Sequence, residues 1–251
     1  MINNRRAFIV GIKSTSLNSN EKKFLRNYKP WGIILFSRNI SSIDQVKNLT
    51  KQIRKIFNDK NYPILIDQEG GRINRLRKFF NTDVFTSKFF GDLYLKDKKK
   101  FNDYYNVFIN VTSNLLKQIG ININTVPVLD LRYKGSSNII GNRSFSHDPK
   151  IVSKIGDICI KRFNKNSIGT VIKHIPGHGL AKVDSHFFTP TINKSLKYLK
   201  NNDFKSFKLK NSFFAMTGHI IFSKIDALNT VTHSKKMIKI IRDHIKYKNI
   251  L

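Results

Sequence analysis

Residues 32–68 read GIILFSRNISSIDQVKNLTKQIRKIFNDKNYPILIDQ, and this stretch decides the fold. It begins with the apolar run 32–36 and ends with the apolar run 63–68, and a helical pattern fills positions 41–57 between them. Neither run alternates apolar with polar residues, so we expect both to form strands that are buried on both faces. Strands of that kind, joined by a helix, predict a parallel sheet.

The same strand–helix pattern recurs about six times along the chain. Further strands are expected at 5–12, 123–130, 169–175 and 212–219, and further helices at about 18–28, 97–119, 149–165, 194–208 and 234–247. The helix that starts near residue 18 has two candidate N-caps, Ser19 and Asn20. The helix at 97–119 is expected to be the longest. Its apolar face is expected to hold Tyr104, Phe108, Val111 and Leu115.

A repeated βα pattern fits either a doubly wound sheet or a (β/α)8 barrel. No glycine-rich phosphate-binding fingerprint follows any expected strand, which weakens the nucleotide-binding sheet and favours the TIM-barrel type. No linker composition interrupts the chain, so residues 1–251 are expected to form a single α/β domain. Residues 249–251 look like the beginning of another strand. The sequence therefore predicts a C-terminally incomplete barrel, with about six βα units and with strands seven and eight missing.

Composition limits the class of protein. Apolar residues make up 40% of the 251 residues, which is typical of a globular chain. Cys159 is the single cysteine, so no disulfide can form within the chain, and this fits a reducing compartment. The N-terminal apolar run at 7–12 is too short for a signal peptide, and no stretch approaches the roughly 18 apolar residues of a membrane span. We therefore expect a cytoplasmic protein with no membrane partner.

The formal net charge of +30 suggests a nucleic-acid or anionic-surface binder. A second interpretation is biased coding, because Lys, Asn, Ile and Phe are abundant together, as in AT-rich genomes. The lysines are spread over the whole length, and the only dense run is KDKKK at 96–100. This distribution favours biased coding over a nucleic-acid partner, although charge alone does not decide function.

Polar residues stand at the ends of four successive expected strands. Asp67 ends the third strand, Asp130 the fourth, and Lys173 and His174 the fifth, while Thr217 and His219 end the sixth. The carboxyl ends of barrel strands open on one face, where active sites are built. The alternative is that Asp67 and Asp130 only cap the turns that follow them. The set of four strand ends favours a site.

Two loops add basic side chains to this face. The segment DQEGGRINRLR (67–77) follows the third strand, and its paired glycines allow a sharp turn close to a ligand. Its arginines, Arg72, Arg75 and Arg77, supply fork-shaped donors, as does Arg143 in the loop 139–149. Acceptors and donors together suit a hydroxyl-rich or anionic ligand. The alternative for each arginine is an ion pair with a neighbouring carboxylate.

The segment KHIPGHGLAKVDSH (173–186) holds several candidate catalytic groups. His174 and His178 have the spacing of a helical zinc pair, but Pro176 and Gly177 prevent a helix there, which argues against a metal site. Ser185 lacks a nucleophile-elbow pattern. Asp184 and His186 are two residues apart on a loop, where the carboxylate can orient the imidazole. Such a pair is a general acid/base that works near neutral pH.

The motif KHIPGHG followed by DSH resembles the signature of the bacterial β-N-acetylhexosaminidases of glycoside hydrolase family three. The segments GIILFSRNI, LIDQEGGRINRLR, PVLDL, GNRSF and MTGHIIF resemble that family in the same order, from about residue 5 to residue 251. General family-three β-glucosidases share the barrel but lack the PGHG and DSH loop. The resemblance is therefore to the hexosaminidase branch.

The resemblance implies a (β/α)8 enzyme that removes terminal β-linked N-acetylglucosamine, typically from muropeptides during cell-wall recycling in the cytoplasm. It implies a retaining mechanism, with His186 as the acid/base and Asp184 as the residue that orients it. It implies no metal and no organic cofactor. The matching sugar-binding positions are Asp67, Arg75, Arg143, Lys173 and His174.

One element of the family pattern is missing from these 251 residues. The nucleophile that the resemblance implies is an aspartate just after the seventh strand, and Asp226 matches a different position. We therefore expect a fragment of a longer product, a decayed gene, or a protein that no longer catalyses hydrolysis. A non-catalytic sugar-binding relic and a basic nucleic-acid or anionic-surface binder are the alternatives to a glycosidase.

Overall fold

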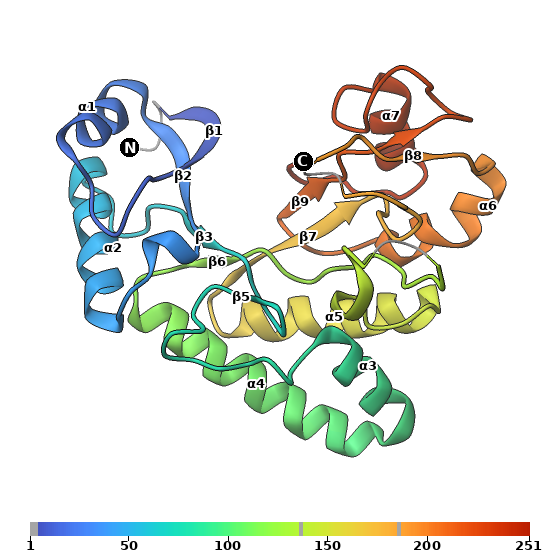
Figure 1. Cartoon of the computed structure of the whole chain (residues 1–251), viewed down its shortest axis with the longest axis horizontal. Helices are drawn as coiled ribbons and strands as arrows, with labels where there is room; N and C mark the ends of the chain where they lie inside the picture. The colour runs from blue at the N-terminus through green and yellow to red at the C-terminus, as the bar shows by residue number, and fades with distance from the viewer. Residues whose placement is uncertain (1–4, 136–137, 185–186) are drawn as a thin grey trace.

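The computed structural model describes residues 5–135, 138–184 and 187–251, and its centre is a sheet of six parallel strands. The order across the sheet is β1-β2-β3-β6-β7-β9. Their bounds are β1 (Arg6–Gly11), β2 (Pro30–Leu35), β3 (Ile64–Ile66), β6 (Ile123–Asn124), β7 (Gly169–Ile175) and β9 (Phe214–Thr217). The sheet curls into a half-barrel with helices along its outer side (Figure 1). The predicted parallel α/β architecture is confirmed.

Helices and short accessory strands complete the described fold. The helices are α1 (Ser19–Tyr28), α2 (Ile43–Phe57), α3 (Ser87–Lys96), α4 (Lys98–Gln118), α5 (Pro149–Lys165), α6 (Leu196–Asn201) and α7 (Lys235–Asp243), with the 3-10 turns η1 (Ser37–Asn39), η2 (Gly141–Arg143) and η3 (Asp203–Phe207). Two small sheets pair β4 (Gln68–Gly70) with β5 (Ile73–Asn74), and β8 (Thr191–Ile192) with β10 (Ile221–Phe222). Among the described residues, none of the helices has the length and apolar character needed to cross a bilayer.

The N-cap of α1 differs from the prediction. Asn18, rather than Ser19 or Asn20, occupies the cap position and closes a capping box with Glu21. The Asn18 side chain accepts a bond of 2.8 Å from the Glu21 backbone, and the Glu21 carboxylate accepts one of 3.0 Å from the Asn18 backbone. A glutamate three residues after the cap decides the position, because both donors are then satisfied reciprocally.

The predicted apolar face of α4 is confirmed for two of its four residues, because Phe108 and Leu115 pack against the main core, and it is wrong for the other two. Tyr104 is 52% exposed and Val111 is 46% exposed, whereas Tyr105 and Ile109 are buried. Both sets of residues are apolar, so periodicity alone did not separate them. Helix α3, which was not predicted, covers this part of α4, because Phe90 packs on Tyr105 with ring centroids 4.6 Å apart and on Phe108 at 5.1 Å.

The central strands bury side chains on both faces, as their continuous apolar runs predict. Ile33, Leu35, Ile64 and Ile66 belong to the main core that includes the helices. The side chains that alternate with them form a second, smaller cluster. It contains Leu65, Ile123 and Val171, with Trp31, Ile34 and Phe214 packed against them. The sheet is therefore an interior layer, and its carboxyl edge is the place where polar residues collect.

The predicted fourth strand, 123–130, is much shorter in the structure. Only Ile123 and Asn124 form a ladder with β3 and β7, although Val128 makes an isolated bridge to Lys173. Pro127 has no backbone N–H to donate, so the ladder cannot run through it. The chain nevertheless continues along β7 and delivers Asp130 to the predicted edge.

Asn124 joins the end of this short strand to the loop that follows β3. Its side-chain oxygen accepts a bond of 3.0 Å from the Gln68 backbone N–H, and its NH2 group donates a bond of 2.9 Å to the Gln68 carbonyl. The amide therefore imitates a strand partner for Gln68. As a result, residues 67–70 are held at a fixed place beside the ends of β6 and β7.

Candidate active site

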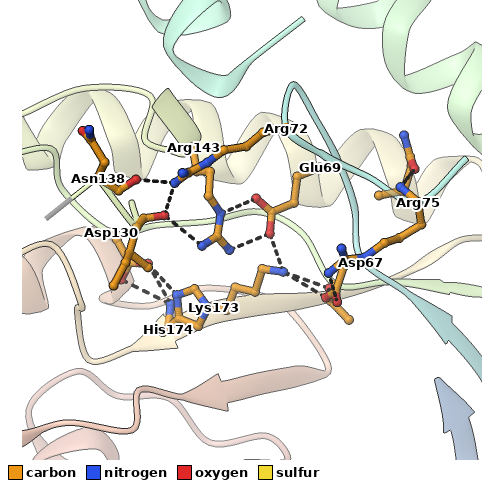
Figure 2. Close-up of polar contacts among 12 residues, drawn as sticks. Asp67, Glu69, Arg72, Arg75, Asp130, Asn138, Arg143, Lys173 and His174 are labelled. Carbon is orange, nitrogen blue, oxygen red and sulfur yellow. Dashed lines mark hydrogen bonds and ion pairs between the residues drawn. The ribbon is translucent and has the colours of Figure 1, made fainter. Parts of the chain in front are cut away.

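Lys173 is the centre of the site at the carboxyl edge of the sheet. It lies on β7, and its ammonium group lies 3.1 Å from Asp67 and 3.0 Å from the Thr125 hydroxyl (Figure 2). Thr125 also donates a hydrogen bond to Asp67, and Arg75 lies 3.2 Å from the other Asp67 oxygen. The structure therefore brings together Asp67, Arg75 and Lys173, as the sequence predicts.

Glu69 is a site residue that the sequence analysis missed. One of its oxygens lies 2.6 Å from the Lys173 ammonium group, and the Arg143 guanidinium holds the carboxylate with two bonds of 2.7 Å (Figure 2). Bidentate contacts of this kind fix the plane of the guanidinium. The available signal was its place two residues after Asp67, because alternate residues of an extended segment point the same way.

The two carboxylates of this cluster are ionised at neutral pH. Burial alone would raise the pKa of Glu69, but the charges of Lys173 and Arg143 outweigh burial and lower it to about 2. Burial likewise opposes ionisation of Asp67, and Lys173, the Thr125 hydrogen bond and Arg75 together hold its pKa well below the usual range. Each carboxylate is thus matched by a cation inside the site.

His174 and Asp130 form the second part of the site. The Asp130 carboxylate is fully buried and lies 2.7 Å from Nδ1 of His174. It also accepts a bond of 2.7 Å from the His178 backbone N–H. Burial opposes ionisation of Asp130, but the two histidines outweigh it and lower its pKa. A carboxylate on Nδ1 fixes the ring and leaves Nε2 as the nitrogen that can face a ligand.

The remaining arginines have different partners. Arg72 donates to the backbone oxygens of Asn138 and Ile139 and so holds the segment before η2 (Figure 2). Arg77 forms an exposed ion pair of 2.8 Å with Asp83, which is the alternative considered for it. The ion-pair alternative is therefore correct for Arg77, while Arg72 has a structural role beside the site.

The predicted acid/base loop is described only in part. His186 and Ser185 lie outside the described residues, so the geometry of the dyad stays a prediction. Asp184 is half-buried, and its charge acts on Arg72. Burial and the neighbouring Arg143 lower the pKa of Arg72, while the charges of Glu69 and Asp184 oppose that shift. Asp184 therefore approaches the site from the side of Arg72.

Two further observations concern possible metal ligands and Asp226. Within residues 5–135, 138–184 and 187–251, no three His, Cys, Asp or Glu side chains gather as metal ligands would. Asp226 lies in the loop after β10, where it accepts a hydrogen bond of 2.6 Å from Ser234. Asp226 thus serves as a turn residue, since it also accepts hydrogen bonds of 3.3 Å from the backbone of Leu228 and Asn229, and its exclusion as the nucleophile stays a prediction.

A half-barrel of parallel strands, with interlocked acidic and basic side chains at the strand ends, defines the class of a barrel-type enzyme with a site for a polar, hydroxyl-rich ligand. Sequence comparison gives the family. Residues 7–251 match the glycosyl hydrolase family 3 N-terminal domain, and the chain belongs to this family. It is a glycoside hydrolase domain, as the motifs predict.

Relatives and solved structures agree with this assignment. The β-hexosaminidase of Nitrosospira multiformis is 30% identical over 249 residues, covering 97% of this chain and 70% of that protein. The β-hexosaminidase of Hydrogenovibrio crunogenus is also 30% identical, with 88% of this chain and 62% of that protein covered. The structure of NagZ from Neisseria gonorrhoeae in complex with N-trifluoroacetyl-D-glucosamine superposes with a TM-score of 0.89, at 29% identity, covering 98% of this chain and 73% of that one. The chain thus spans roughly two thirds of the length of these relatives.

Proposed function

We propose that this glycoside hydrolase is a retaining β-N-acetylhexosaminidase that removes terminal β-linked N-acetylglucosamine from peptidoglycan-derived muropeptides in the cytoplasm. The observation that carries the proposal is the cluster in which Lys173 lies between Asp67 and Glu69 and in which Glu69 holds Arg143. Family membership and the β-hexosaminidase relatives support the reaction class. The muropeptide rests on the motif resemblance.

The charge balance of the cluster supports a neutral ligand. Each cation of the cluster is bound by a carboxylate, since Lys173 and Arg75 pair with Asp67 and Arg143 pairs with Glu69. The cluster therefore has no surplus of cations, unlike the surface of this strongly basic chain. A phosphate site would leave positive charge without a protein partner. Polarised donors and acceptors without net charge suit the hydroxyl and acetamido groups of an amino sugar.

Each site residue then has a defined part in binding. Asp67 accepts hydrogen bonds from ring hydroxyls, and Arg75 and Lys173 orient it while donating to neighbouring sugar oxygens. Arg143 donates to the sugar from a plane that Glu69 fixes. His174 accepts a hydrogen bond from a sugar hydroxyl at Nε2, because its Nδ1–H is bound to the Asp130 carboxylate. Fixed donors of this kind lose little entropy when the sugar binds.

His186, oriented by Asp184, protonates the leaving oxygen and later activates water, as a retaining mechanism requires. The nucleophile is an aspartate placed after a seventh strand. The described carboxylates of the cluster, Asp67, Glu69 and Asp130, are held in ion pairs and are poor substitutes for it. A polypeptide of residues 1–251 is therefore expected to bind N-acetylglucosamine with little or no turnover.

Calorimetry with N-acetylglucosamine and with glucose tests binding by residues 1–251. We expect binding of the amino sugar, loss of binding in Lys173→Met, and no change in the exposed control Asp92→Asn. A second experiment joins residues 1–251 to the part of the Neisseria gonorrhoeae relative that the alignment leaves uncovered. This chimera is expected to release nitrophenol from a nitrophenyl N-acetyl-β-glucosaminide, and His186→Ala is expected to abolish the release. Absence of both binding and turnover would contradict the proposal.

The relic and the glycosidase are separated by the same pair of experiments. Binding by residues 1–251, with no turnover in a chimera that folds, favours the relic. Ordinary rates of hydrolysis by residues 1–251 alone would show that another carboxylate has replaced the expected nucleophile.

A further inference from the structure

A buried carboxyl group lies directly beneath the turn of residues 176–179. Asp203, the first residue of η3, is 1% exposed. Gly177 has a φ of +138°, and a Cβ atom built on it would lie 2.8 Å from the Cβ of Asp203. The turn therefore rests on the Asp203 side chain with no room for a larger residue. The chain continues from this turn towards Asp184.

Asp203 is held in place by the segment that follows β6. The Tyr133 hydroxyl donates a bond of 2.8 Å to its Oδ2 atom. Ser206 ties η3 to the same segment, with a bond of 2.7 Å from its hydroxyl to the Leu129 carbonyl. The Oδ1 atom of Asp203 is buried and, among the described residues, has no hydrogen-bond partner. An ionised carboxylate with an unsatisfied oxygen is costly in such a place.

Asp203 and Asp130 both contact residues 174–178, but they titrate differently. Asp130 binds the backbone and ring of His174 and the backbone of His178, and it stays ionised. Burial, with a smaller contribution from Asp130, raises the pKa of Asp203 to about 7, although the Tyr133 hydrogen bond opposes the shift. Two carboxyl groups whose surroundings separate their pKa values divide their tasks.

The elements α5, α6 and β7 pack against η3 and carry other ionisable groups. They include Tyr198 of α6, which acts on Tyr133, His174 of β7, which binds Asp130, and Asp157 of α5, which pairs with Lys210 at 3.0 Å. Lys210 and Arg143 are already bound by carboxylates. Ionisation of Asp203 would thus add a negative charge next to Asp130 without a new cation to balance it.

We propose that Asp203 is a positioning residue whose buried carboxyl group, held by Tyr133, supports the turn 176–179 and so sets the approach of the loop that carries Asp184. The proposal rests on the proposed function, because that loop is the proposed acid/base loop. When Asp203 loses its proton, the carboxylate needs water, and water can reach it only if the turn lifts away from it.

The linkage has a defined sign. The pKa of Asp203 is about 7 when the turn is closed and has the ordinary value of 3.8 when the turn is open. The closed turn is therefore favoured fully below pH 3.8, and this preference is lost as the pH rises to about 7. Opening should therefore become easier by up to about tenfold per pH unit between pH 5 and 7, and should level off above that range.

Amide hydrogen exchange of residues 174–184, corrected for intrinsic exchange, measures this opening between pH 5 and 8. We expect the protection of wild type to fall over that range, and that of Asp203→Asn, a neutral isostere, to stay constant. Tyr133→Phe should extend the fall to higher pH, because the hydrogen bond that opposes the shift is gone. Asp92→Asn on α3 is the matched control, with exchange of α2 as the internal reference.

A pH-independent protection in wild type, or the same pH dependence in Asp203→Asn, would overturn the proposal. If Asp203 had only a structural role, Asp203→Asn would lower the exchange protection of residues 174–184 by the same factor at every pH. Binding of N-acetylglucosamine by wild type, followed over the same pH range, forms a separate arm. If the sugar does not bind, the proposed function fails, while the exchange data still decide whether Asp203 controls the turn.

Discussion

Lys173 and Glu69 form an ion pair of 2.6 Å, in which both side chains are 3% exposed. Burying two charges is costly, and replacing such a pair by apolar residues often costs nothing in stability. The positions that the Lys173–Glu69 pair imposes on its neighbours explain the pair better than a gain in stability does. Lys173 also reaches Asp67, and Glu69 also fixes Arg143, so a single pair sets the positions of both groups that would face the sugar.

Removal of Glu69 tests this geometry. We expect Glu69→Ala to lower the free energy of unfolding by about 3–5 kcal/mol, because it leaves Lys173 and Arg143 as buried cations with one partner fewer. Glu69→Gln keeps the shape and should unfold less readily than Glu69→Ala, yet bind N-acetylglucosamine more weakly than wild type. Urea unfolding and calorimetry measure the two effects. The control is Asp83→Asn, which breaks an exposed pair and should change stability by at most about 1 kcal/mol. Equal effects of the three variants would contradict the expectation.

Acid should destabilise the protein through the same residue. The pKa of Glu69 falls from an ordinary 4.5 to about 2 on folding, so its contribution to stability is present above about pH 4.5 and is lost as pH falls towards 2. Unfolding free energies measured across that range should decline less steeply in Glu69→Gln than in wild type. Parallel curves for the two proteins would show that Glu69 does not titrate in this way.

Gly91 should be intolerant of a side chain even though it lies in a helix. Alanine is favoured over glycine inside helices by about 1 kcal/mol, but a Cβ here would lie 1.7 Å from the Phe145 carbonyl oxygen. Because that neighbour is backbone, we expect Gly91→Ala to destabilise the protein by about 1–3 kcal/mol. Thermal or urea unfolding measures the loss. The control is Leu95→Ala on the same helix, which should change the stability little, because Leu95 is 61% exposed. If Gly91→Ala stabilised the protein, α3 would have to move away from residue 145.

Cys159 should be unreactive in the folded protein. Burial raises the pKa of its thiol to about 12, and the side chain is 2% exposed. Thiolate is the reactive form of cysteine. A chromogenic disulfide reagent at pH 8 should therefore label Cys159 in the native protein only as fast as the protein opens around that residue. The same reagent should label the urea-unfolded chain completely and rapidly. Fast stoichiometric labelling without urea would mean that α5 separates readily from α4.

Sequence patterns located the elements whose signals are local. Residues 149–165 were expected to be a helix, and α5 spans Pro149–Lys165, because Asp148 caps it and proline starts it. The strand ends also indicated which side chains would meet, since Lys173 of β7 pairs with Asp67 after β3, and His174 pairs with Asp130. In a parallel sheet, the position of a residue at a strand end already implies its neighbours in space.

The remaining features depend on contacts between distant segments. Phe90 of α3 covers the buried side of α4, and no local pattern predicted α3. Pro127 shortens the fourth strand, because it has no N–H for the ladder with β7. Glu69 becomes a site residue because Lys173 and Arg143, both distant in the sequence, lie against it. The role of His186, outside the described residues, stays a prediction.

Deamidation of Asn124 would damage the site, because the side-chain amide of this residue holds the site together. Slow hydrolysis of that amide would turn its NH2 group, which donates to the Gln68 carbonyl, into a second oxygen. Two acceptors would then face each other in a fully buried place, and the segment bearing Glu69 would come loose from the end of β6. The hydrogen bonds to Gln68 also keep the amide of Asn124 from turning towards its own backbone. Deamidation in the folded protein should therefore occur at other residues first, and at Asn124 only after unfolding.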